Sequence, residues 1–188
     1  MQYRIEVIHK KDCKDPDGLK ALGAIRNLGV EAVSDVRAIS VFLVDGRLGR
    51  RQVRTLTEGL FVDPIVQQYR VCGPDEERWP WAEGRGVHSI EVKRRPGVMD
   101  PVQQSAMKGA ADLGLGKSVR AIRTATKYLV RGKLTREQLE RIALVHRQVI
   151  LIDTPHLLGG EIHPDGHPQV GVRSRGRGHS RPHRRSPG

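Results

Sequence analysis

Hydrophobic and charged residues alternate at the start of the chain. Tyr3, Ile5 and Val7 are separated by Arg4 and Glu6, which is the period of a strand with one buried face. Further extended runs cover residues 33–44 and 65–71, and Asp45-Gly46 provides a turn signal. The pattern predicts three strands in the first 72 residues.

Two helices are expected between these strands. Asp15 is a good N-cap, Pro16 suits the first helical position, and Gly29 can adopt the left-handed conformation that ends a helix. The predicted inward stripes are Leu19, Leu22, Ile25 and Leu28 in the first helix, and Val53, Leu56 and Leu60 in the second.

The chain contains an internal repeat. A shift of 85 residues superimposes the first strand on residues 90–92 and the first helix start on Asp100-Pro101. The same shift places Leu28-Gly29 on Leu113-Gly114, and one inserted residue then changes the shift to 86. The matches at the new shift include Val33 with Val119, Arg37 with Arg123, Leu43-Val44 with Leu129-Val130, Gly46 with Gly132, and Leu48 with Leu134.

The second copy follows the same plan. Its first helix is predicted from Asp100-Pro101 to Gly114, and a capping box at 135–138 opens its second helix. Val149–Ile152 could form its closing strand. The predicted inward residues are Val102, Ala106, Ala110 and Leu113 in the first of these helices, and Leu139, Ile142 and Val145 in the second.

The predicted fold class is α/β (α+β), with two tandem β-α-β-α-β units packed as a pseudo-dimer and helices on one face of each sheet. We divide the chain into a first module at 1–72, a linker at 73–86, a second module at 87–153 and a disordered tail at 154–188. The linker holds Trp79 and Trp81, which could anchor a partner or pack back on their own domain.

The chain carries a net charge of +12, and its distribution decides how this charge is interpreted. Residues 159–188 hold six arginines and two acids, a net +4, and the remaining +8 is interleaved with Glu and Asp. A solvated basic surface explains most of this. The alternative is non-specific, salt-dependent nucleic-acid binding through the tail, whose arginines are Arg173, Arg175, Arg177, Arg181, Arg184 and Arg185.

Cysteine and hydropathy patterns bear on the compartment. Cys13 and Cys72 have no metal-binding spacing, so a reducing cytoplasm fits. No apolar run reaches the length of a membrane span, and the first residues resemble a strand rather than a signal peptide. The tail histidines could give at most a weak, adventitious metal site; they are His163, His167, His179 and His183.

Three segments resemble functional motifs. Gly114–Ser118 has the end of a phosphate-binding loop, but Ala111 stands where that motif requires glycine, and the segment follows a helix instead of preceding one. Cys13 has no base marked for it. Lys93, Arg94 and Arg95 could meet an acidic partner or form a plain basic loop. We therefore expect no catalytic, cofactor-binding or metal-binding residues.

Both copies resemble the PurS-type small subunit of phosphoribosylformylglycinamidine synthase. The resemblance rests on the first strand, the helices opened by Asp-Pro and closed by Leu-Gly, and residues 33–37 with their match at 119–123. It also includes 63–69 in the first copy, which the second copy lacks at 144–147, and it ends after Asp153. Residues 94–101 are similar to the N-terminal region of the large single-chain synthase, which looks like a fused pair.

The resemblance implies a non-catalytic assembly component of an ATP- and glutamine-dependent ligase in purine biosynthesis. Its partners would be the synthetase and glutaminase subunits, which would use ATP, Mg and glutamine themselves. Edge strands or sheet faces would supply the contacts. The pair within one chain would make it a monomer. The sequence is compatible with a native subunit, a fragment or a decayed relative, and with a tail that is genuine or frame-shifted.

Overall fold

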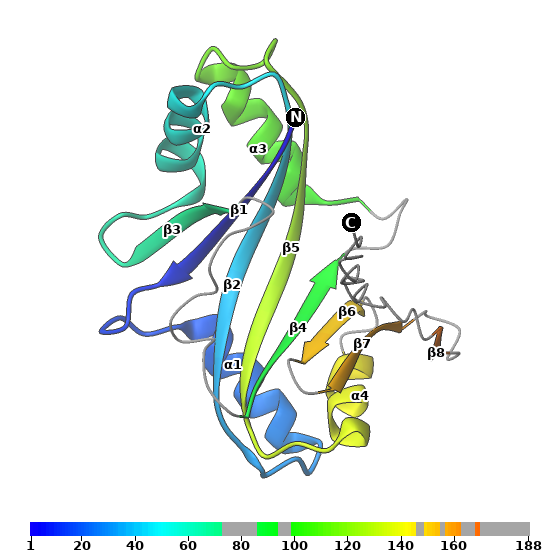
Figure 1. Cartoon of the computed structure of the whole chain (residues 1–188). Coiled ribbons are helices and arrows are strands. Elements are labelled where there is room, and N and C mark those ends of the chain that lie inside the picture. Colours follow the sequence, from blue (N-terminus) through cyan, green and yellow to red (C-terminus); the bar gives the residue numbers. More distant parts are fainter. Residues whose placement is uncertain (73–85, 94–98, 146–148, 155–156, 163–167, 170–188) are drawn as a thin grey trace, which may run out of the picture.

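The chain forms one antiparallel sheet with all of its described helices on one face (Figure 1). In this computed structural model, side chains are described as far as residue 143. The described residues are 1–72, 86–93, 99–145, 149–154, 157–162 and 168–169.

The sheet has the strand order β3-β1-β2-β5-β4-β6-β7-β8, and every pairing is antiparallel. Its centre is the pair β2 and β5, which are 14 residues long each and join the two halves of the chain. The strands are β1 Gln2–His9, β2 Val33–Gly46, β3 Gln67–Cys72, β4 Val87–Lys93, β5 Val119–Gly132, β6 Val149–Thr154, β7 Leu157–Ile162 and β8 Pro168–Gln169.

The helices gather in two groups, one at each end of the central strands. Helices α2 and α3 share one end, and α1 and α4 share the other (Figure 1). Each group therefore contains one helix from each half of the chain. The helices are α1 Pro16–Asn27, α2 Arg50–Leu56, which continues as the π-helix η1 Thr57–Phe61, α3 Pro101–Asp112 and α4 Arg136–Val145.

Buried aspartates begin α1 and α3, as the sequence predicts. Asp15 accepts a hydrogen bond from the Gly18 amide at 2.9 Å, and its second oxygen accepts one from the Ala38 amide of β2 at 2.7 Å. Asp100 accepts from the Val102 amide and from the Thr124 hydroxyl of β5. Each aspartate thus caps its helix and also ties it to a central strand.

Helix α1 approaches the sheet closely at Gly18. A Cβ at this position would lie 2.5 Å from the Val36 carbonyl oxygen, so a larger residue would push the helix away. The helix ends at Gly29, which has φ +76°, and Gly114 ends α3 with φ +75°. Both ends follow the sequence prediction, because glycine adopts this backbone conformation without steric strain.

Two hydrophobic cores lie under the helices, and each draws on both halves of the chain. The first core combines α2 and strands β1 and β2 with α3 and β5. The second combines α1 and β2 with β4, β5 and α4. Burial in both cores therefore depends on the two halves being together. The largest buried members are Ile5, Leu56 and Ile122 in the first core, and Ile90, Leu139 and Ile142 in the second.

Four predicted inward residues are exposed instead, and these predictions are wrong. Leu19 lies beside the buried stripe of α1, which runs through Gly18, Ala21 and Ile25. Leu60 lies in η1, where the wider π turn brings Phe61 to the core in its place. The four residues and their exposed fractions are Leu19 58%, Leu60 37%, Val102 48% and Leu113 38%.

The C-terminal part contains the closing strand that the sequence analysis expects, because β6 pairs with β4. Strands β7 and β8 lie at the start of the segment 154–188 and pair along the edge of the sheet. The rest of the tail, including its histidines and arginines, lies outside the described residues. So do Trp79, Trp81, Arg94 and Arg95.

Candidate functional site

The face of the sheet opposite the helices carries a buried set of charges. Because Ile5 and Val7 pack into the first core, strand alternation turns Arg4 and Glu6 to the other face. An apolar cluster from β1, β2, β4 and β5 lies on this same face. Its members are Ile8, Ile39, Val41, Val87, Ala125 and Leu129.

Glu6 is the centre of this charged set. Its side chain is almost fully buried, and its residue exposure is 1%. It accepts hydrogen bonds from Arg4 at 2.8 Å, from Arg70 of β3 at 2.9 Å and from Lys127 of β5 at 3.4 Å. Three cations from three strands therefore surround one carboxylate.

Glu91 occupies the position that matches Glu6 in the repeat, and its exposure is 7%. It pairs with Arg4 at 2.7 Å and with Lys93 at 3.1 Å. The Arg4–Glu91 and Lys127–Glu6 pairs each connect one half of the chain to the other. The charged set thus acts as a cross-link over the central strand pair.

The surrounding cations control the ionisation of both carboxyl groups. Burial disfavours the charged form of Glu6, but Lys127, Arg4 and Arg70 outweigh it and lower the pKa to about 2. The pKa of Glu91 is also lowered, because Arg4 and Lys93 outweigh its burial. Both groups are therefore charged at neutral pH, and neither has the raised pKa that suits a general acid.

The motif-like segments fall at positions that do not favour chemistry. Gly114–Ser118 connects the end of α3 to β5, so helix N-terminal amides do not face it. Cys13 is a free, half-buried thiol in the loop before α1. Lys93, which was expected to meet an acidic partner or to lie in a basic loop, instead pairs with Glu91 of its own strand.

The aromatic residues of the described part of the chain pack in or against the two cores. Phe42 stacks on Phe61 with ring centroids 4.1 Å apart. Tyr3 and Tyr69 pack against the first core, and Tyr128 packs against the second. The strands whose side chains the structure describes thus present no exposed aromatic platform of the kind that single-stranded RNA binders use.

Two further features are absent from the described residues. No group of three or more His, Cys, Asp or Glu side chains in this part of the chain could hold a metal ion. None of its helices is long and apolar enough to cross a membrane.

Sequence reasoning did not single out the charged set. The one available signal was the identity of Glu6 and Glu91 within strands that otherwise match on apolar positions. Their partners come from β1, β3, β4 and β5, and only the pairing of strands across the sheet brings them together. The set joins strands and holds its carboxylates charged, which is the arrangement of a structural element.

The fold and this site define an α+β protein whose described polar clusters cap helices and join strands. Comparison with family models gives a more particular assignment. Residues 2–73 match the PurS model, described as phosphoribosylformylglycinamidine (FGAM) synthase. The chain therefore contains a PurS domain at residues 2–73, which ends with β3. A search of curated proteins found no match.

Proposed function

We propose that the chain is a fused pair of PurS-like units that acts as a non-catalytic assembly component of FGAM synthase. In this role it bridges the synthetase and glutaminase subunits, which supply the chemistry with ATP, Mg and glutamine. The first support is the PurS domain at 2–73. The second is the arrangement of the remaining strands and helices around it.

The register of β2 on β5 is the observation that carries the proposal. Ser40 pairs with Thr126, and these residues match each other in the repeat at the shift of 86. Val36 pairs with Val130 and Val44 pairs with Ile122, so each strand presents the same positions to the other. This reciprocity is the property of a two-fold, self-complementary interface.

The outer strands support the proposal of a fused pair. Glu6 pairs with Val41 in the first half, and the matching residues Glu91 and Lys127 pair in the second. Strand β6 then takes the position beside β4 that β3 takes beside β1. The second half therefore has a closing strand even though it lacks the turn sequence that precedes β3.

A co-purification experiment tests this proposal. The full chain would be tagged and mixed with the synthetase and glutaminase of the same organism, with ATP and glutamine present. We expect one copy of the chain to be retained with both proteins. Failure to retain either protein would contradict an assembly role.

A further inference from the structure

One end of the molecule carries a concentrated positive charge. Six exposed basic side chains lie here, on α2 and the turn before it and on the α3–β5 connection with the first residues of β5. We call this set the basic end. Its members are Arg47, Arg50, Arg51, Arg54, Lys117 and Arg120.

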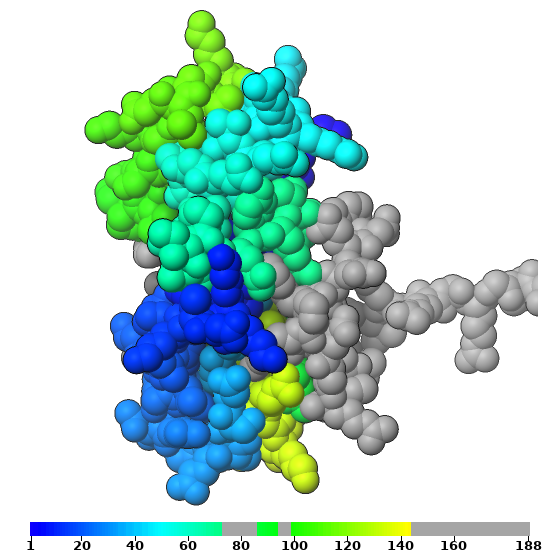
Figure 2. Space-filling view, turned by 90° about the vertical axis from the view of Figure 1, so that its left-hand side faces the viewer, coloured from blue at the N-terminus to red at the C-terminus, as the bar shows by residue number. Residues whose placement is uncertain are grey.

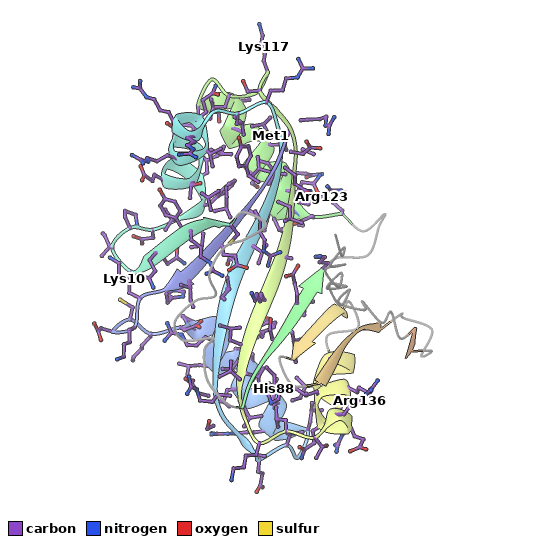
Figure 3. The ribbon with its side chains drawn as sticks, in the orientation of Figure 1. Met1, Lys10, His88, Lys117, Arg123 and Arg136 are labelled. Carbon is purple, nitrogen blue, oxygen red and sulfur yellow. The ribbon has the colours of Figure 1, made fainter. Side chains whose placement is uncertain are left out.

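The two segments that make up the basic end are adjacent in space. The Arg47 amide donates a hydrogen bond to the Ser118 carbonyl at 2.8 Å. Figure 2 shows the cyan residues of α2 and the green residues of α3 packed together at this end. Lys117 projects from its tip, whereas Arg136 lies at the opposite end of the molecule (Figure 3).

The opposite end has a different charge at the matching positions. The repeat aligns the six basic residues with two basic residues, three acids and one serine. When the nearby Asp45 and Asp112 and their matches Arg131 and Asn27 are included, the net charge is +4 at the basic end and zero at the other. The six matching residues are Lys133, Arg136, Glu137, Glu140, Glu31 and Ser34.

Intramolecular contacts leave most of this charge available. Arg120 pairs with Asp45, but the other five basic side chains form no ion pair with the described part of the chain. At the opposite end Arg136 pairs with Glu140 at 2.9 Å. Arg136 therefore has an ion-pair partner within the described residues, whereas Arg50 at the matching position has none there.

Two of the three arginines of α2 are placed against the stability of their own helix. Arg50 and Arg51 lie in its first turn, which contains no acidic residue. Positive charge at a helix N-terminus opposes the helix dipole. The first turn of α4 contains Glu137 in the position that matches Arg51. The charges of Arg50 and Arg51 thus have no local structural benefit.

Exposed apolar side chains adjoin the basic end. Leu60 and Leu113 are both partly exposed, and they lie where η1 meets α3. A Cβ on Gly59 would lie 3.1 Å from Leu113 Cδ1, and one on Gly109 would lie 2.7 Å from Leu60 Cδ2. Arginine is enriched at protein–protein interfaces, whose cores are apolar, whereas a phosphate-binding surface needs only the cations.

We infer that the basic end is a docking surface for an acidic face of a protein partner. This inference rests on the proposed function, and it specifies which of the two ends receives that partner. Fusion of the two units in one chain allows the two ends to differ in charge, because a pair of identical subunits would present the same charge at both ends.

Charge reversal of α2 in the full chain tests the inference. The variant carries Arg50→Glu, Arg51→Glu and Arg54→Glu, and its affinity for the synthetase and for the glutaminase is measured by biolayer interferometry. We expect binding to one of them to weaken by at least about tenfold. Wild-type binding should also weaken as salt is raised. Arg→Gln at the same positions should weaken binding less.

The control variant reverses three exposed charges at the opposite end: Arg26→Glu, Lys133→Glu and Arg136→Glu. It changes the net charge of the chain by the same amount, so a general electrostatic effect would weaken both variants alike. We expect its affinity to stay within about twofold of the wild type. Circular dichroism of both variants checks that they remain folded.

The remaining outcomes separate the two proposals. If the wild type binds and the α2 variant binds equally well, or if both variants weaken alike, the inference is wrong and the proposed function stands. If the wild type binds neither protein, both are wrong. The full chain could instead bind a 20-base-pair DNA or RNA duplex more tightly than it binds either protein, and lose this binding in the α2 variant. In that case the surface is a nucleic-acid site and the inference is overturned.

Discussion

The two halves of the chain share a backbone plan but differ in the charges they place on it. The buried acids Glu6 and Glu91, the capping aspartates Asp15 and Asp100, and the strand register match between the halves. Exposed residues at the two ends do not match. This difference fits the proposed fusion, in which pairing constrains the interior and the outer surface of each unit can specialise.

Separating the two halves of the chain should have the largest effect on its folding and oligomeric state. A fragment of residues 1–72 loses the α3 and β5 residues of the first core and the β4, β5 and α4 residues of the second. We expect it to form a dimer, because β2 can pair with its own copy in the register that it uses with β5. Sedimentation equilibrium should give twice the fragment mass, whereas the full chain should be a monomer. A folded, monomeric fragment would show that the halves are independent.

Replacing the two matching acids should have the second-largest effect on stability, and the two replacements should differ. Glu6→Gln leaves three cations around a neutral side chain, and Glu91→Gln leaves two. Because the cations are partly exposed, we expect losses below the full value for a buried pair: about 2–3 kcal/mol for Glu6→Gln and about 1–2 kcal/mol for Glu91→Gln. Urea unfolding measures both. Equal losses would contradict the view that Glu6 is the centre of the set.

Lowering the pH should remove the stabilisation that Glu6 contributes. The folded state lowers the pKa of Glu6 from 4.5 to about 2, so the folded state binds this proton less readily than the unfolded state does. The contribution is therefore complete above about pH 4.5 and is lost as the pH falls towards 2. The free energy of unfolding should decrease less steeply over this window in Glu6→Gln. An unchanged slope would show that another group causes the acid sensitivity.

The two capping aspartates should differ by a smaller amount. Asp15→Ala removes a helix cap and also leaves the buried Ala38 amide without its acceptor. Asp100→Ala removes a cap and frees the Thr124 hydroxyl, which can rotate towards another acceptor. We expect losses of about 2–3 kcal/mol for Asp15→Ala and about 1–2 kcal/mol for Asp100→Ala by urea unfolding. The reverse order would contradict the assigned role of the Ala38 contact.

The smallest effect should come from exchanging one charge between the ends. Arg51→Glu gives α2 the residue found at the matching position of α4, and it favours the helix dipole. We expect a stabilisation of about 0.3–0.5 kcal/mol, visible as a rise of about 1 °C in the thermal midpoint. Glu137→Arg should have the opposite effect. Destabilisation by Arg51→Glu would show that Arg51 has a structural role of its own.

Local features of the fold could be predicted from sequence, and long-range ones could not. The Asp-Pro helix starts, the glycine helix ends and the Thr135 capping box depend on neighbouring residues, and the Thr135 and Gln138 hydrogen bonds confirm the box. The exposure of Leu60 depends on a π turn that periodicity does not reveal. The shared cores and the charges around Glu6 depend on which strands pair, so the linear pattern could not specify them.

We propose that one chain does the work of a pair of small subunits in FGAM synthase. The most direct test is the rate of glutamine-dependent amidine formation by the synthetase and glutaminase of the same organism, with and without the full chain. We expect the rate of amidine formation to rise as the chain is added and to saturate at one chain per synthetase. Full activity without the chain, or no response to it, would contradict the claim.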